Sequence, residues 1–110
     1  AEKKLAKLDF EAPLMKIGPI KYGEVKDYIL EFTNTGKHDF KIFHLEGGCD
    51  CTEPIDWSRG AIVPGKKGFI TFRFNSKKAK VDPAYASSLN IYGNLEGDLV
   101  IYDIEAQVVD

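Results

Sequence analysis

The only two cysteines of this 110-residue chain, Cys49 and Cys51, are separated by a single residue. A Cys-x-Cys pair fits several kinds of chemistry: a disulfide that closes a small ring, two free thiols, a soft-metal site, or a catalyst of thiol–disulfide exchange. Two cysteines are too few for a disulfide framework, so their closeness is the informative feature. Their surroundings, "LEGGCDCTEPIDW", bear on each alternative.

A disulfide between Cys49 and Cys51 requires a bent loop. Bonded cysteines have Cα atoms about 4.4–6.8 Å apart, whereas an extended pair two residues apart spans roughly 6.5–7 Å. A bend at Gly47 and Gly48 would bring the two cysteines within bonding range. Because so small a ring removes little chain entropy, the bond would stabilise the fold only slightly. Two free thiols are expected instead if the protein works in a reducing compartment.

Metal binding is the third alternative. Two thiolates suit soft ions such as Cu(I) or Zn²⁺. His44, upstream of Cys49, is a third candidate ligand, although period-two alternation places it on the same face as Phe40 and Ile42, where histidines usually pack. The chain offers no complete zinc site, because a closed site needs more ligands than this set supplies. Cys49, Cys51 and His44 are therefore the candidate soft-metal set.

Catalysis by a thiol needs a thiolate stabilised by a helix N-terminus or by nearby cations. No helix signal follows Cys51, and the acidic neighbours Asp50 and Glu53 disfavour a thiolate. Elsewhere, Ser58 lacks the Gly-x-Ser-x-Gly elbow of serine hydrolases, and no glycine-rich segment has phosphate-loop spacing. We therefore expect no catalytic residues, no bound cofactor and no enzymatic activity.

Period-two alternation of apolar and polar residues dominates the chain and predicts half-buried strands. Seven such segments, separated by turn residues at roughly ten-residue spacing, predict one antiparallel β-sandwich domain over residues 1–110. The longest stretch without a clear pattern, residues 76–86, is expected to be a loop. The predicted extended segments are 6–13, 15–25, 27–36, 39–48, 69–75, 88–94 and 99–109.

The overall composition restricts the partners. The formal net charge is −2, which gives no basic footprint for nucleic acid. No apolar run approaches the roughly 18 residues of a transmembrane helix, and the start "AEKKLAKLDF" lacks the apolar core of a signal peptide. Trp57 and Tyr22 are candidate protein-interface residues because aromatic side chains are enriched in interface cores. Such residues more often cover the open end of a sandwich.

Several short motifs occur in a fixed order from about Asp9 onward: Gly23-Glu24, Phe32-Thr33-Asn34-Thr35-Gly36, Cys49-Asp50-Cys51-Thr52, Pro64-Gly65 with Gly68, and Phe74-Asn75-Ser76. Together these motifs resemble the bacterial family catalogued as domain of unknown function 1573. The resemblance implies an immunoglobulin-like sandwich and an exported, periplasmic or envelope-associated protein, but it implies no reaction. The sequence departs from the family at Gly47-Gly48 and within residues 16–20.

We therefore expect a non-enzymatic envelope module that binds or displays protein through an exposed edge strand or a loop. In this hypothesis the cysteine loop and residues 56–60 form one end of the sandwich and shape the contact. The alternative is a soft-metal-handling or thiol-redox accessory protein that uses Cys49 and Cys51, with His44 as a further ligand. A third hypothesis is an architectural repeat within a larger chain.

Overall fold

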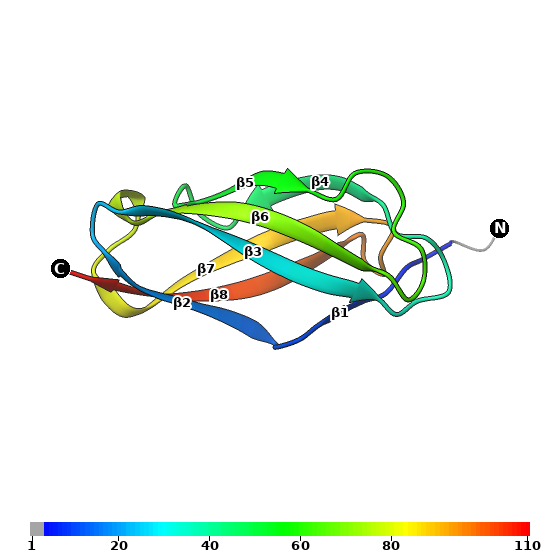
Figure 1. The fold of residues 1–110 in the computed structure, drawn as a ribbon, viewed down its shortest axis with the longest axis horizontal. Helices are drawn as coiled ribbons and strands as arrows, with labels where there is room; N and C mark the ends of the chain where they lie inside the picture. Colours follow the sequence, from blue (N-terminus) through cyan, green and yellow to red (C-terminus); the bar gives the residue numbers. More distant parts are fainter. Residues whose placement is uncertain (1–3) are drawn as a thin grey trace.

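The computed structural model describes residues 4–110, which form eight strands and one short 3-10 turn, η1 (Ser76–Lys78), in two facing layers (Figure 1). One sheet has the order β1-β3-β6-β5 and the other β2-β8-β7-β4. The strands are β1 (Leu8–Phe10), β2 (Leu14–Lys21), β3 (Val25–Asn34), β4 (Ile42–Gly47), β5 (Thr52–Trp57), β6 (Lys67–Asn75), β7 (Asp82–Gly93) and β8 (Leu99–Val109).

The predicted all-β, immunoglobulin-like sandwich is confirmed, with two differences. The structure has eight strands where the sequence predicted about seven. The pairing of β2 with β8 is parallel, whereas the other pairings between strands are antiparallel, so the second sheet is mixed. Residues 4–7, ahead of β1, are not helical.

Alternate side chains from both sheets fill the core, as the period-two pattern predicted for β3, β6, β7 and β8. Phe32 and Phe40 lie edge to face with ring centroids 5.7 Å apart, a favoured aromatic geometry. Burying one such side chain stabilises the fold by roughly 1.5–3 kcal/mol. The largest fully buried apolar residues are Phe32, Phe40, Phe72, Phe74, Ile20, Ile70, Leu89, Ile91, Ile104 and Val108.

The strand that the sequence did not predict is β5, which begins directly after Cys51. Its Pro54 lacks the N–H that a ladder needs, so the segment reads as a loop. Proline is tolerated there because β5 is an edge strand that pairs only with β6, with a register shift between Pro54 and Asp56. The cysteines therefore precede a strand of the sandwich.

The prediction that His44 lies on the same face as Phe40 and Ile42 is wrong. The register with β7 shifts between Ile42 and His44, so Phe43 and His44 are both exposed. Phe40 is fully buried but lies before β4, where it forms an isolated bridge with Ile62. A bulge adds one residue to the strand and reverses the alternation, which a strict period-two reading cannot anticipate.

The predicted loop over residues 76–86 is also shorter than expected. After η1 the chain enters β7 at Asp82, and Pro83 lies where the register with β8 shifts between Asp82 and Tyr85. Proline is common at such bulges because no ladder hydrogen bond is lost there.

Asn34 ties the end of β3 to two neighbouring loops from a fully buried position. Its Nδ2 donates to the carbonyl oxygens of His38 and Ile62, each at 2.9 Å, and its Oδ1 accepts from the Gly36 amide at 3.0 Å. The Asn of the "F-T-N-T-G" motif is therefore a connector that satisfies buried backbone groups.

Replacing Asn34 with Ala should lower the free energy of unfolding by about 2 kcal/mol or more, because buried backbone groups lose their partners. Urea denaturation monitored by circular dichroism measures this loss. Asn90→Ala, on the outer side of β7, is the matched control and should cost under about 0.5 kcal/mol. Equal losses in the two variants would contradict the connecting role of Asn34.

Candidate functional site

The first half of β3 has a partner strand on one side only. β3 pairs with β6 from Val25 to Thr33, whereas β1 covers only Phe32–Asn34. After Phe10 the chain leaves this sheet and enters β2, which pairs with β8 in the other sheet. Within residues 4–110, no strand pairs with residues 25–31 on the side that β1 would occupy.

The hydrogen bonds at the end of β3 show which backbone groups face this open side. The backbone N–H of Asn34 donates to the Lys66 carbonyl on the β6 side at 3.0 Å. The backbone N–H of Thr35 donates to the Lys7 carbonyl on the β1 side at 2.8 Å. The β3–β6 register is unbroken, so backbone direction alternates along the strand. The N–H and C=O groups that point to the unpaired side belong to Asp27, Ile29 and Glu31.

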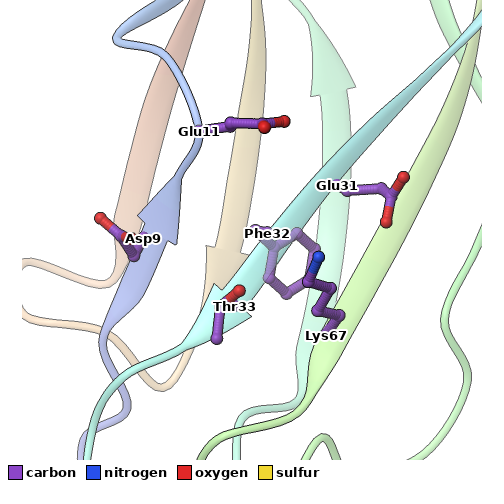
Figure 2. Close-up of a pocket in the computed structure, with 6 residues that line it drawn as sticks. All are labelled: Asp9, Glu11, Glu31, Phe32, Thr33 and Lys67. Atoms are coloured by element: carbon purple, nitrogen blue, oxygen red, sulfur yellow. The ribbon is translucent and has the colours of Figure 1, made fainter.

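A groove runs beside this edge, between β3 and the chain that passes from β1 into β2; we call it the edge groove. Figure 2 shows its acidic part, in which Glu11 extends from the end of β1 toward β3 and Lys67 enters from β6. The adjoining part shares Glu11 and Glu31 with the first and has more apolar residues in its lining. The lining side chains include Asp9, Glu11, Glu31 and Lys67 in the first part, and Leu14, Met15, Lys16, Ile29 and Tyr102 in the second.

The outer face beside the edge carries an ion pair. Arg73 donates from Nε to Oδ1 of Asp27 at 2.9 Å and from Nη2 to Oδ2 at 3.2 Å. This bidentate hydrogen bond lowers the pKa of the Asp27 carboxyl below its ordinary value. Next to this pair on β3, Ile29 is 61% exposed, which is unusual for a large apolar side chain.

The second candidate site is the cysteine loop, residues 48–51, in which the structure joins Cys49 and Cys51 as a disulfide with Cα atoms 5.2 Å apart. Cys51 is fully buried and Cys49 is partly exposed. The bend predicted at the two glycines is present: a Cβ on Gly47 would collide with the carbonyl of Thr52, and one on Gly48 with the Ser88 hydroxyl.

The structure does not bring His44 together with the cysteines. Its Nε2 lies 3.0 Å from Oε1 of Glu46, and its exposed ring faces Tyr92. In the described part of the chain, no group of three or more His, Cys, Asp or Glu residues could hold a metal ion. The proposed three-residue soft-metal set therefore does not form a cluster in this structure.

Trp57 and Tyr22, the candidate interface aromatics, lie in different places. Trp57 is half-buried at the end of β5, where the Arg59 guanidinium lies 4.0 Å from its ring centroid. Tyr22 is exposed, and its hydroxyl donates to the Lys77 carbonyl in η1 at 3.3 Å. The expectation that the cysteine loop and residues 56–60 share one end of the sandwich is wrong, because the loop precedes β5, whereas residues 56–60 lie at the other end of that strand.

The edge residues Asp27, Ile29 and Glu31 were not predicted as a site. Alternation along residues 27–36 placed Ile29 and Glu31 on the face opposite Leu30 and Phe32, and that assignment holds. The sequence carried no signal that the neighbouring strand would stop after Phe10, because strand pairing is decided by segments far apart in the chain. The apolar Ile29 between Asp27 and Glu31 on the same face was the local clue.

A family model described as "Protein of unknown function (DUF1573)" matches residues 8–108. A protein of unknown function from Porphyromonas gingivalis W83 is similar over 96% of this chain and 48% of its own, with 16% identity and a TM-score of 0.75. The secreted serine protease VesC from Vibrio cholerae is similar over 98% of this chain and 24% of its own, with 15% identity and a TM-score of 0.70.

The ASH / PapD-like domain 7 of human CEP192 is similar over the whole chain and 90% of its own length, with 14% identity and a TM-score of 0.65. At these identities the likenesses show the fold alone. The chain spans about half of the Porphyromonas protein and about a quarter of the Vibrio protein. No curated protein matches the chain significantly. Within residues 4–110, no helix is long and apolar enough to cross a membrane.

Amide hydrogen exchange along β3 should alternate. The amides of Tyr28 and Leu30 are bonded to β6 and should exchange at least about tenfold more slowly than those of Asp27 and Ile29, which face the unpaired side. Exchange measured by two-dimensional NMR resolves each position. Uniform protection of all four amides would mean that the edge is covered.

The Asp27 carboxyl should titrate below the ordinary range of an aspartate, and the Arg73→Gln variant should return it toward that range. Because the folded pKa is lowered, the contribution of the pair to stability is present above the unfolded pKa and is lost as pH falls through the folded one. Carboxyl carbon shifts followed by NMR report the midpoint. Identical midpoints in the two proteins would show that Arg73 does not hold the carboxylate.

Proposed function

The chain belongs to the family of proteins of unknown function designated DUF1573, and we propose that it is a non-enzymatic module that binds an extended segment of another protein along the open edge of β3. The observation that carries this proposal is the run of unpaired backbone groups at Asp27, Ile29 and Glu31. An added strand would satisfy these groups in the same way as a native ladder.

The other sheet edges are less suited to a partner strand. β5 contains Pro54 and a register shift, and β4 contains a shift after Ile42. β2 contains Pro19 and a shift between Ile17 and Ile20. Bulges and prolines are the devices by which sheet edges avoid pairing. The unpaired half of β3 has no proline and an unbroken register with β6, so it offers the longest regular template.

The edge groove suggests the chemistry of the bound segment. Asp9, Glu11 and Glu31 line one part together with a single cation, Lys67. The adjoining part contains the half-buried Met15 and the exposed Ile29. Successive side chains of a bound strand point to opposite faces, so an extended segment with basic and apolar residues can place each in a matching part.

We further propose that the module works outside the reducing cytosol. The disulfide between Cys49 and Cys51 supports an oxidising compartment, because disulfides persist mainly in exported proteins. The similarity to a domain of a secreted protease is compatible with it. The resemblance of the motifs to an exported bacterial family points the same way.

Binding can be tested with a library of about nine-residue peptides that mix Lys or Arg with Val, Ile or Leu, a length that spans a typical strand. Fluorescence anisotropy identifies the tightest peptide. Replacing Ile29 with Pro should lower the affinity for that peptide at least about tenfold, or 1.4 kcal/mol. The edge then lacks the backbone N–H of residue 29, and the proline ring obstructs the incoming strand. Ile29→Ala keeps the N–H and is the matched control.

Two outcomes would contradict the proposal. One is a peptide that binds Ile29→Pro as tightly as the unchanged protein, while the amides bonded to β6 show that the variant is folded. The other is binding that newly protects amides of β4 or β5 and leaves Asp27, Ile29 and Glu31 exchanging as before. Glu31→Lys should lower the affinity for basic peptides more than for uncharged ones. This difference distinguishes the contribution of the groove's charge from that of the backbone hydrogen bonds.

A further inference from the structure

The disulfide of the cysteine loop joins two residues of one short connection between β4 and β5. The backbone already holds this loop: Gly48 donates to the Ser88 carbonyl and Asn75 donates to the Cys51 carbonyl, both at 2.8 Å. A link that closes so small a ring removes little entropy from the unfolded chain. The bond therefore contributes little to stability.

We propose that Cys49–Cys51 is a reducible bond that exchanges with the dithiol of a thioredoxin-class protein, and that the partner attacks Sγ of Cys49. This inference does not depend on the open edge of β3. It assigns a chemical role to each cysteine: Cys49 is the position of the mixed disulfide, and Cys51 is the leaving group.

Exposure distinguishes the two sulfurs. Cys51 is 0% exposed and belongs to the hydrophobic core. Cys49 is partly exposed and lines a groove between the edge strands β4 and β5, together with Gly47, Glu53 and Pro54. Exchange requires a thiolate to reach one of the two sulfurs, and burial of Cys51 leaves Cys49 as the accessible cysteine.

Two hydroxyls stand beside the leaving sulfur. Oγ1 of Thr52 lies 3.6 Å from Sγ of Cys51, and Oγ of Ser87 lies 3.8 Å from it and 3.3 Å from Sγ of Cys49. The hydroxyls are 2.7 Å apart and hydrogen-bonded to each other. Hydroxyl protons rotate freely, so either group can donate to a thiolate released at Cys51.

The exchange balances in two steps. The partner thiolate forms a bond to Sγ of Cys49 as the Cys49–Cys51 bond breaks, and Cys51 leaves with the electron pair and takes a proton. The second thiolate of the partner then attacks the partner sulfur of the mixed disulfide and releases Cys49 as a thiolate, which is protonated. The protein gains two electrons and two protons, and the partner becomes a disulfide.

Charge selects among attacking thiols. Glu46, Asp50 and Glu53 line this groove with a single cation, Lys78. Like charges repel a small anionic thiol, and salt screens the repulsion over about 10 Å at 0.1 M. A cationic thiol such as cysteamine should therefore reduce the bond faster than the anionic 2-mercaptoethanesulfonate, by about threefold to tenfold at low salt, after correction for their thiolate fractions. Asp50→Asn should bring the reduction rates for the cationic and the anionic thiol closer together. Asp98→Asn, outside this groove, should leave their ratio unchanged.

The decisive experiment traps the mixed disulfide. The oxidised protein is incubated with a thioredoxin whose resolving cysteine is replaced by serine, and the adduct is mapped by peptide mass spectrometry. We expect the adduct on Cys49. An adduct on Cys51, no adduct at all, or an unreduced protein that is alkylated at both cysteines would overturn the proposal.

Single-cysteine variants supply an independent measurement. In Cys51→Ala the remaining Cys49 should react with an aromatic disulfide reagent at least about tenfold faster than the Cys51 thiol of Cys49→Ala, because burial blocks access. Circular dichroism shows whether each variant is folded. If Cys51→Ala fails to fold, the trapping experiment on the unchanged chain still decides. Ile29→Pro should react like the unchanged protein, so failure of edge binding and failure of exchange are distinguishable.

Discussion

Each strand in this protein has to bury one face against the opposite sheet while its backbone groups find partners in its own sheet. Phe72 and Phe74 of β6, in the interior of one sheet, face the apolar residues of β7 and β8 in the other. These central strands meet both demands over most of their length. The edge strands, and the part of β3 that β1 leaves unpaired, meet them only in part, and the two candidate sites lie there.

The chain crosses between the sheets early, and this crossing opens the first site. β1 pairs with the last residues of β3, and the chain then continues into β2, which belongs to the other sheet. Since a strand cannot pair in both sheets at once, the first half of β3 loses a neighbour. Tyr102 donates a hydrogen bond to the Ala12 carbonyl at 3.0 Å and so fixes the crossing point beside the edge groove.

Another crossing between the sheets, from β4 to β5, forms the cysteine loop. The loop is tight enough that neither Gly47 nor Gly48 has room for a side chain. Other motif residues have clear backbone roles: Gly65 adopts a φ of +85° in its turn, and the Ser76 hydroxyl donates to the carbonyls of Lys21 and Glu24. The disulfide differs from these, since backbone bonds already hold the loop that it closes.

Local alternation made much of the fold predictable. The inward faces of β3, β6, β7 and β8 were assigned correctly because a strand's side chains alternate whatever its partner. The prediction from alternation was wrong at His44, where a bulge reverses the faces of the strand. It also missed the edge strand Thr52–Trp57, because Pro54 is atypical of strands. Both errors fall on the edge strands beside the cysteine loop, where register depends on the pairing strand as well as on local residue types.

The sequence by itself determined the class of fold, the turns and the closeness of Cys49 to Cys51, because these depend on neighbours along the chain. Only the tertiary structure decided that β1 stops short of Glu31, that His44 turns away from the cysteines, and that Cys51 is buried while Cys49 is not. The physical reason is that pairing and burial join segments far apart in sequence, and no local pattern encodes which strand is left without a partner.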